Sequence, residues 1–456
     1  MASNFNSPEG NLEDYFVDEY FLIDQFVGDT LWVWGYNTYG QLGDNTTTTK
    51  STPVTTFAGG TNWKQVSCGY IHTTAIKTDG TLWTWGQNAN GQLGTNDTNG
   101  RNTPVTTLSG GSNWKQVGGG LYHTAAIKTD GTLWTWGYNP YGQLGTNDTT
   151  NRSTPVTTFA GGSNWKQVSS SAIYCAAIKT DGTLWTWGFN GEGNLGTNDI
   201  THRSTPVTTF AGGTNWKQVS AGNATTAAIK TDGTLWVWGY NLTNQLGIND
   251  TTNRSTPVTT FAGGTNWKQV DCGNFHCAAI KTDGTLWTWG YNPYGALGNN
   301  GGGGATPVTT FAGGTNWKQV DVGGSVYGTT AAIKTDGTLW IWGIGLAGEL
   351  GNNDSVYFAK YTPVTTFAGG TNWKSVSIGQ GAGASGVTGM VSAIKTDGTL
   401  WTWGDNTHGG LGTNDTTNRS TPVTTFAGGT NWKQVKINYA SCVAITSGTD
   451  PTFFVS

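Results

Sequence analysis

The chain has 456 residues, of which 71 are glycine and only 11% are charged, and its formal net charge is −4. This weak negative charge excludes a general electrostatic attraction to nucleic acid or to anionic lipid. The 24 tryptophans argue against disorder, and the absence of an eighteen-residue apolar run predicts no membrane span.

Residues 1–29 are distinct from the rest of the chain. They include seven acidic residues and no lysine or arginine. Because Met1 to Asn11 lack the basic start and apolar centre of a signal peptide, we expect synthesis in the cytoplasm without export. The segment is too apolar for a simple acidic tail. We expect it either to lie on the flank of the main domain or to anchor the protein to an assembly partner, with the aromatic candidates Tyr15, Phe16, Tyr20, Phe21 and Phe26.

From Thr30 the chain consists of tandem copies of one unit. The phrase Leu-Trp-x-Trp-Gly occurs eight times, with five spacings of 51 residues and then spacings of 53 and 61. A fixed long period is the signature of a repeat architecture, in which neighbouring units bury one another. The first tryptophans of the eight phrases are Trp32, Trp83, Trp134, Trp185, Trp236, Trp287, Trp340 and Trp401.

One copy predicts four short antiparallel strands. The pair Asp79-Gly80 suits a tight turn, because it tolerates positive φ. In the strand that follows, Trp83 and Trp85 share one face and Leu82 shares the other with a threonine, so both faces need cover. A proline begins the last strand, which we therefore place outermost. The expected strands are A (63–67), B (73–77), C (81–85) and D (104–107).

The order of motifs in this copy resembles the regulator of chromosome condensation repeat. Val66 to Gly94 contain Val-x-Cys-Gly-x-x-His-Thr-x-Ala, then Asp-Gly, then Leu-Trp-x-Trp-Gly-x-Asn-x-x-Gly-Gln-Leu-Gly. The resemblance extends from Thr30 to about Ile445 and implies a β-propeller, which has seven blades in that family. The eight copies instead predict eight blades, with seven as the alternative if the two ends of the chain do not pair.

The ends of the repeat region predict how the ring closes. The first copy begins at strand C, and the last stops after strand B, at about Ile445. Pairing of these two half-blades would remove both free sheet edges. We therefore expect an all-β fold with a single propeller domain over residues 30–456.

Comparison of the copies predicts one variable face. The B-to-C turns and D-to-A connections hardly change, whereas the A-to-B and C-to-D connections differ freely. In an up-and-down blade these two pairs lie at opposite ends, which we call the constant face and the variable face. Loops on a rigid frame commonly carry binding residues, and tyrosine among small polar residues suits recognition. The candidates are Tyr36, Tyr39, Tyr70, Tyr122, Tyr138, Tyr141, Phe189, Glu192, Tyr240, Phe275, Tyr291, Tyr294 and Tyr327.

Clusters with chemical reactivity are not expected. His72, His123 and His276 occupy one repeat position and would lie in separate blades, so we expect buried structural histidines and no metal. The repeated Lys-Thr-Asp-Gly turns predict solvated charge pairs, not one asymmetric catalytic site. Equivalent positions of the cysteines predict buried thiols and no disulfide framework. We expect no catalytic residue and no cofactor. The cysteines are Cys68, Cys175, Cys272, Cys277 and Cys442.

These features favour a non-enzymatic recognition or structural propeller that binds protein or glycan through the variable face. The near-identical copies and the aromatic arm favour an exposed component of a larger assembly, such as a phage virion surface or tail fibre, and a homo-oligomer is a further alternative. The family resemblance offers a second function, guanine-nucleotide exchange on a Ran-type GTPase. No basic arm for chromatin is present, which disfavours that second function.

Overall fold

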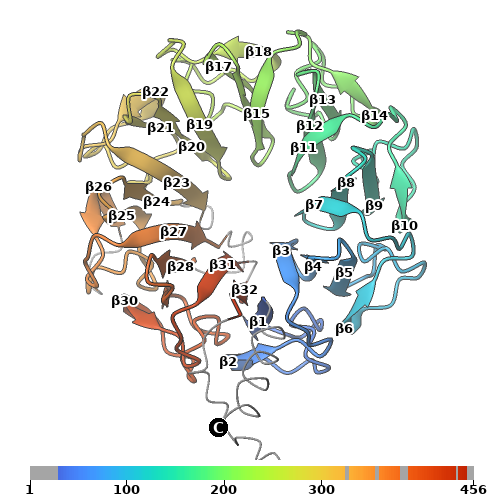
Figure 1. Ribbon diagram of the computed structural model, residues 1–456. Coiled ribbons are helices and arrows are strands. Elements are labelled where there is room, and N and C mark those ends of the chain that lie inside the picture. Colours follow the sequence, from blue (N-terminus) through green and yellow to red (C-terminus); the bar gives the residue numbers. More distant parts are fainter. Residues whose placement is uncertain (1–28, 324–327, 355–358, 380–388, 438–439, 449–456) are drawn as a thin grey trace, which may run out of the picture.

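The computed structural model describes residues 29–323, 328–354, 359–379, 389–437 and 440–448. These residues form 32 strands and no helix, and the strands build eight four-stranded antiparallel sheets. The sheets stand round a central axis as the blades of a propeller, with strand A innermost and strand D outermost (Figure 1). The prediction of eight blades is confirmed.

Seven blades are continuous in sequence. Blade 1 contains β3 (Trp63–Cys68), β4 (His72–Lys77), β5 (Leu82–Gly86) and β6 (Arg101–Thr106). Blade 2 contains β7 (Trp114–Gly119), β8 (His123–Lys128), β9 (Leu133–Gly137) and β10 (Arg152–Thr157). Blade 3 contains β11 (Trp165–Ser170), β12 (Tyr174–Lys179), β13 (Leu184–Gly188) and β14 (Arg203–Thr208). Blade 4 contains β15 (Trp216–Ala221), β16 (Thr225–Lys230), β17 (Leu235–Gly239) and β18 (Arg254–Thr259).

Blades 5 to 7 repeat the arrangement. Blade 5 contains β19 (Trp267–Cys272), β20 (His276–Lys281), β21 (Leu286–Gly290) and β22 (Gly304–Thr309). Blade 6 contains β23 (Trp317–Gly323), β24 (Thr329–Lys334), β25 (Leu339–Ile344) and β26 (Ala359–Thr365). Blade 7 contains β27 (Trp373–Ile378), β28 (Met390–Lys395), β29 (Leu400–Gly404) and β30 (Arg419–Thr424).

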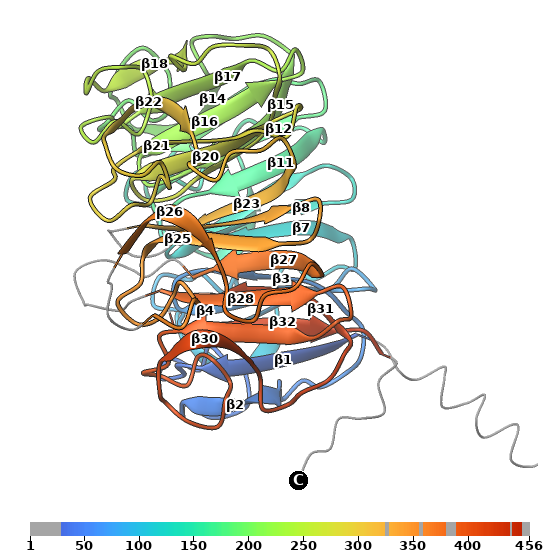
Figure 2. The same ribbon diagram turned by 90° about the vertical axis from the view of Figure 1, so that its left-hand side faces the viewer.

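The eighth blade, here the closing blade, joins the two ends of the chain. Its strands are β31 (Trp432–Ile437), β32 (Ser441–Thr446), β1 (Thr30–Gly35) and β2 (Lys50–Thr55). β1 pairs antiparallel with β32, so that Trp34 lies opposite Cys442. Figure 2 shows β1 and β32 side by side in this blade. The predicted pairing of terminal half-blades is confirmed.

The predicted strands agree with the observed ones except at strand D. β6 begins at Arg101, three residues before its proline, because Arg101 pairs with Gly86 beyond an irregularity in the ladder. The turn between β4 and β5 has Gly80 at φ 80°, as expected. A Cβ at Gly80 would lie 2.1 Å from the Ser112 carbonyl oxygen. This glycine is therefore required by close approach as well as by conformation.

The core lies between the blades. Leu31 and Val33 of the closing blade pack with Trp63, Val66 and Trp85 of blade 1. On its other face, blade 1 presents side chains such as Ile76 and Leu82 to the tryptophans of blade 2. Each sheet is thus covered on both faces, as the alternation along strand C predicted.

Each full copy also stacks a lysine on two tryptophans. The Lys77 Nζ lies 4.6 Å from the ring centroid of Trp63 and 4.5 Å from that of Trp83. The lysines of the Lys-Thr-Asp-Gly turns are therefore engaged in cation–π contacts, and the expectation of solvated charge pairs with the turn aspartates was wrong. Burial between the rings lowers the pKa of Lys77.

The three predicted structural histidines connect neighbouring blades. The Nε2 atom of His72 lies 3.1 Å from Thr124 Oγ1, that of His123 lies 3.2 Å from Cys175 Sγ, and that of His276 lies 2.9 Å from Thr330 Oγ1. Burial lowers their pKa values, to about 3 for His72 and about 4 for His123 and His276. They are neutral at physiological pH and serve the packing, as expected.

Candidate binding face and channel mouth

The predicted aromatic candidates gather in small clusters on the variable face. Tyr36 makes edge contacts with Tyr39 and His408, with ring centroids 6.3 and 5.0 Å apart. Three further clusters bring rings together, two of them between successive copies and one within blade 5. They are Tyr70 with Tyr122 and Tyr138, Tyr141 with Phe189 and His202, and Phe275 with Tyr291.

The other candidates take different places. The Asn253 side-chain amide donates to Glu192 Oε2 at 2.6 Å, which links two C-to-D connections. Tyr240 and Tyr294 are half-buried. Tyr327 lies outside the described residues, as do the arm candidates Tyr15, Phe16, Tyr20, Phe21 and Phe26.

Few of the candidate rings are widely exposed. Tyr39 is 42% exposed, and the other described aromatic candidates are half-buried against their neighbours. Apolar side chains that the copy comparison missed are more exposed than Tyr39 on the same face, namely Ile200, Leu242 and Leu346. They belong to the C-to-D connections of blades 3, 4 and 6, so the apolar surface of this face is not confined to the aromatic clusters.

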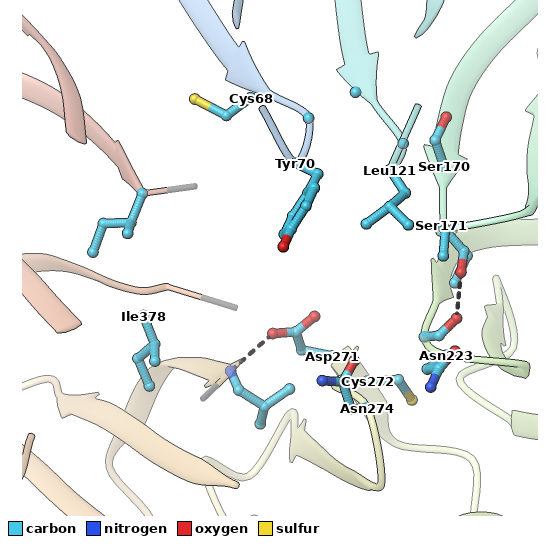
Figure 3. Close-up of a pocket in the computed structure, with 18 of the residues that line it drawn as sticks. Cys68, Tyr70, Leu121, Ser170, Ser171, Asn223, Asp271, Cys272, Asn274 and Ile378 are labelled. Carbon is cyan, nitrogen blue, oxygen red and sulfur yellow. Dashed lines mark hydrogen bonds between the residues drawn. The ribbon is translucent and has the colours of Figure 1, made fainter. Parts of the chain in front are cut away.

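A recess of about 590 Å³ opens at the variable end of the central channel. The ends of the innermost strands and the A-to-B connections line it, and residues of all eight blades contribute. Figure 3 shows Tyr70 and Asp271 extending into this space from different blades. The polar and charged lining residues include Tyr70, Ser170, Asn223, Asp271, Asn274, Asp321 and Lys436.

One repeat position of strand A sets the chemistry of this recess. The residue after the strand's valine is Ser67, Gly118, Ser169, Ser220, Asp271, Asp321, Ser377 or Lys436, depending on the blade. Because strand A is an inner edge, its backbone N–H groups need acceptors from outside their own sheet. The Ala221 N–H donates to Ser169 Oγ at 3.1 Å and the Cys272 N–H donates to Ser220 Oγ at 3.2 Å.

Blades 5 and 6 use carboxylates for the same purpose. The Val322 N–H donates to Asp271 Oδ2 at 3.1 Å, and the Ile378 N–H donates to Asp321 Oδ2 at 2.7 Å. Burial in the channel wall raises the pKa of both carboxyls, to about 7 for Asp321, where the charge of Asp271 adds to the effect. The charge of Lys436 opposes both shifts. The recess therefore holds two adjacent carboxyls and one ammonium group.

The sequence contained a signal for this site that the copy comparison overlooked. Asp271, Asp321 and Lys436 are the charged residues at a position that holds serine or glycine in the other copies. The comparison concentrated on the connections and left the strands aside, although the last residues of strand A face the channel. Tyr70 and Phe275 are the predicted candidates that also line the recess.

One expectation about the cysteines was wrong. Cys272 and Cys277 form a disulfide, with their Cα atoms 4.2 Å apart. They are directly opposed partners in the β19–β20 ladder of blade 5, so the expectation of buried thiols fails for this pair. Cys175 and Cys442 are buried free thiols, as expected, whereas Cys68 is a half-buried free thiol. Burial raises the pKa of all three thiols to about 12.

Metal-ligand groups do not assemble in the part of the chain that the structure describes. It contains no set of three or more histidine, cysteine, aspartate or glutamate side chains placed to hold a metal ion. The same residues contain no helix long and apolar enough to cross a membrane.

Comparison with known families decides the assignment. The RCC1-like domain matches residues 30–387, and the RCC1 repeat matches residues 397–453. The chain belongs to the RCC1-like domain family. The resemblance seen in the sequence is thereby confirmed, and this RCC1-like propeller has eight blades.

Two plant proteins are among its relatives. The ultraviolet-B receptor UVR8 of Arabidopsis thaliana is 33% identical over 276 residues, which cover 59% of this chain and 63% of UVR8. The mitochondrial RCC1 domain-containing protein RUG3 of the same plant is 29% identical over 294 residues, covering 61% of this chain and 64% of RUG3. The match thus spans less than two thirds of either relative.

Solved structures share the fold at low identity. Human WBSCR16 superposes with a TM-score of 0.63 at 20% identity, covering 92% of this chain and 100% of that chain. Yeast RCC1 (Prp20), solved with Kap60, gives 0.62 at 16% identity, covering 99% of this chain and 96% of that chain. At such identity the likeness concerns the fold alone.

Proposed function

We propose that this RCC1-like propeller is a non-enzymatic recognition protein that binds a protein partner through its variable face. The observation that carries the proposal is the recess at the channel mouth. It opens on the variable face and bears Asp271 and Asp321 at a position where the other copies have serine or glycine, except for Lys436 in the closing blade. A basic side chain of the partner would suit two carboxyls opposed by a single ammonium group. The exposed Leu242 and Leu346 lie on the same face and supply apolar contact.

The relatives support a protein as the ligand. Yeast RCC1 was crystallised with Kap60, and the structure of Prp20p from Saccharomyces cerevisiae was described together with its binding properties to Gsp1p and histones. UVR8 is named a receptor. These statements concern those proteins, and they favour protein recognition as the use of an RCC1-like propeller.

The proposal is tested by removing the two carboxyl charges while keeping the hydrogen bonds between neighbouring blades in the channel wall. In the double variant Asp271→Ser and Asp321→Ser, serine can still accept the N–H of the next blade, as Ser169 and Ser220 do. The full chain is immobilised as the wild type, as this variant and as the constant-face control Phe210→Ser. The proteins that each of the three retains are then quantified by mass spectrometry. We expect a partner retained by the wild type and the control and reduced at least tenfold with the double variant.

The pH dependence of retention provides a second test. Because the pKa of Asp321 is raised to about 7, its negative charge forms as the pH rises through that value. Retention of a basic partner should therefore increase from pH 6 to pH 8 in the wild type and change less in the double variant. Equal retention by all three proteins at both pH values would show that the recess does not bind the partner.

Finer hypotheses extend this proposal. If a glycan array shows binding that survives the double substitution, the ligand is a glycan and the site lies elsewhere on the variable face. An exposed role in a larger assembly, such as a virion surface or tail fibre, is tested by locating the protein on intact particles with an antibody. Acceleration of nucleotide release from a Ran-type GTPase would favour the exchange-factor alternative instead.

A further inference from the structure

The constant face exposes one large apolar side chain in every blade. Each lies in a D-to-A connection, directly after a buried threonine such as Thr56. Each is between 59% and 65% exposed. Isolated exposed apolar residues are common on protein surfaces, but a similar one at the same place in all eight blades forms a pattern. These residues are Phe57, Leu108, Phe159, Phe210, Phe261, Phe311, Phe367 and Phe426.

The same connections lead to a lysine in every blade. The second residue of each strand A lies at an irregularity of the A–B ladder, as Lys64 does between Trp63 and Gln65, and its side chain is exposed. Among the described acidic residues, Asp29 is the one that pairs with a member of this set, through Lys433. The set is Lys64, Lys115, Lys166, Lys217, Lys268, Lys318, Lys374 and Lys433.

These residues form two concentric circles. The apolar residue follows the outermost strand and the lysine belongs to the innermost strand, so the apolar circle surrounds the basic circle on one face. Among the described residues, the side chains of both sets are exposed and the pair of Lys433 with Asp29 is the one ion pair of the lysines, whereas the other repeated lysines are stacked on tryptophan. The B-to-C turns of the same face carry equal numbers of lysines and aspartates, such as Lys77 and Asp79. The eight strand-A lysines therefore leave this face with an excess of positive charge on a protein whose net charge is negative.

We propose that this face is the docking surface for residues 1–28 of the same chain. The described chain starts at Asp29, whose side chain pairs with Lys433 and whose backbone bridges to Asn62 at the start of blade 1. The segment before Asp29 therefore leaves from the constant face. It contains six acidic residues, no lysine or arginine, and eight large apolar residues between Tyr15 and Phe26.

The composition of the segment complements the two circles. Its carboxylates match the inner lysines, and its aromatic residues match the outer phenylalanines. Twenty-eight residues span up to about 90 Å when extended, so the segment can reach several blades. The inference concerns the opposite face from the proposed binding recess and does not depend on it. It favours docking on the propeller itself over anchoring to an assembly partner.

The test measures the chemical reactivity of the lysines in the full chain. Wild type and a variant with Tyr15, Phe16, Tyr20 and Phe21 changed to serine are acetylated briefly with an amine-reactive reagent and analysed by mass spectrometry. We expect Lys64 and Lys433 to react at least threefold faster in the variant, because the segment no longer covers them. Lys436, which is exposed at the channel mouth, is the internal control and should react equally in both proteins.

A second pair of variants tests the docking face directly. Phe57→Ser with Phe426→Ser removes the apolar side chains that follow strand D of the closing blade and of blade 7, and Phe210→Ser removes the one that follows strand D of blade 3. The double substitution should increase the reactivity of Lys64 and Lys433 more than Phe210→Ser does. Since all three side chains are exposed, the substitutions should leave the melting temperature unchanged.

Two results would overturn the proposal. Equal lysine reactivity in the wild type and all variants would show that nothing covers this face. Protection that increases with protein concentration, together with sedimentation as a dimer, would assign the face to the segment of a second copy instead of the same chain.

Discussion

Glu349 shows how a single residue can depart from its repeat position. The equivalent residues in other copies include Gln41, Gln92, Gln143 and Gln245. Glu349 is 1% exposed, and its carboxylate accepts the Ala347 N–H at 2.8 Å and the Gly389 N–H at 3.0 Å. Burial nevertheless raises its pKa to about 7. A titratable carboxyl thus occupies a place where most copies have a neutral amide.

Glu349→Gln should change the pH dependence of stability. A folded-state pKa of about 7, above the ordinary value of 4.5, means that the wild type loses stability as the pH rises from about 4.5 through 7. The glutamine variant lacks this titration. Its free energy of unfolding should improve relative to the wild type by about 1–3 kcal/mol between pH 5 and pH 8.

Denaturant unfolding at several pH values measures this difference. Gln92→Glu is the matched control and should introduce the opposite dependence, because it places a carboxyl at the same position in blade 1. A constant difference between Glu349→Gln and the wild type from pH 5 to pH 8 would contradict the buried charge.

At the scale of structural elements, the C-to-D connections are stabilised by a central asparagine. The Asn88 side-chain amide donates to the Asp97 carbonyl oxygen at 2.9 Å, and its Oδ1 accepts the Leu93 N–H at 2.9 Å. Asn88 is buried, so loss of its side chain would leave buried backbone groups without partners. These long connections are therefore ordered parts of each blade.

Asn88→Ala should destabilise its connection by about 2–4 kcal/mol, because each buried unpaired group costs about 1–3 kcal/mol. Amide hydrogen exchange of residues 87–100 measures the loss locally. Asn292→Ala in blade 5 is the control. Asn292 makes a similar bond to the Leu297 N–H at 3.0 Å but is half-buried, so water can replace it and the loss should be smaller. An equal increase of amide exchange in the C-to-D connection of each variant would show that burial of the asparagine does not determine the cost of losing its side chain.

At the scale of the whole molecule, the ring is closed by hydrogen bonds and packing between β1 and β32. Trp34 is fully buried in the closing blade, and its Nε1–H donates to the Gly410 carbonyl oxygen of blade 7 at 2.8 Å. Trp187 has the equivalent place in blade 3, with a bond to Gln143 at 2.9 Å. The two tryptophans differ in whether their blade is continuous in sequence.

Trp34→Ala and Trp187→Ala should each cost about 3–5 kcal/mol locally, as large-to-small core substitutions do. Only Trp34→Ala should also accelerate amide exchange in both β2 and β31, because no covalent link holds the halves of the closing blade together. Exchange that stays local in both variants would show that the ring does not depend on this closure.

The sequence alone determined the repeat, the four strands of each blade, their order and the closure of the ring. The strands and their order depend on patterns within about 50 residues, such as the Asp79-Gly80 turn and the alternation round Trp83 and Trp85, which fix the local backbone geometry. The closure was predictable because each end of the repeat region carries half of one copy. The pairing of Cys272 with Cys277 belonged to this class too, since both lie in one A–B hairpin. It was missed because cysteines were compared only between copies.

Only the tertiary structure determined which side chains lie close together round the central axis. Asp271, Asp321 and Lys436 come from blades 5, 6 and 8 of the ring, and their convergence depends on the number of blades and on closure, not on any local pattern. The tertiary structure also decided exposure: most candidate tyrosines pack on their neighbours, whereas the blades leave Phe57 and its equivalents uncovered. Side-chain periodicity fixes the face of a strand, but only the packing of blades fixes which residues water still reaches.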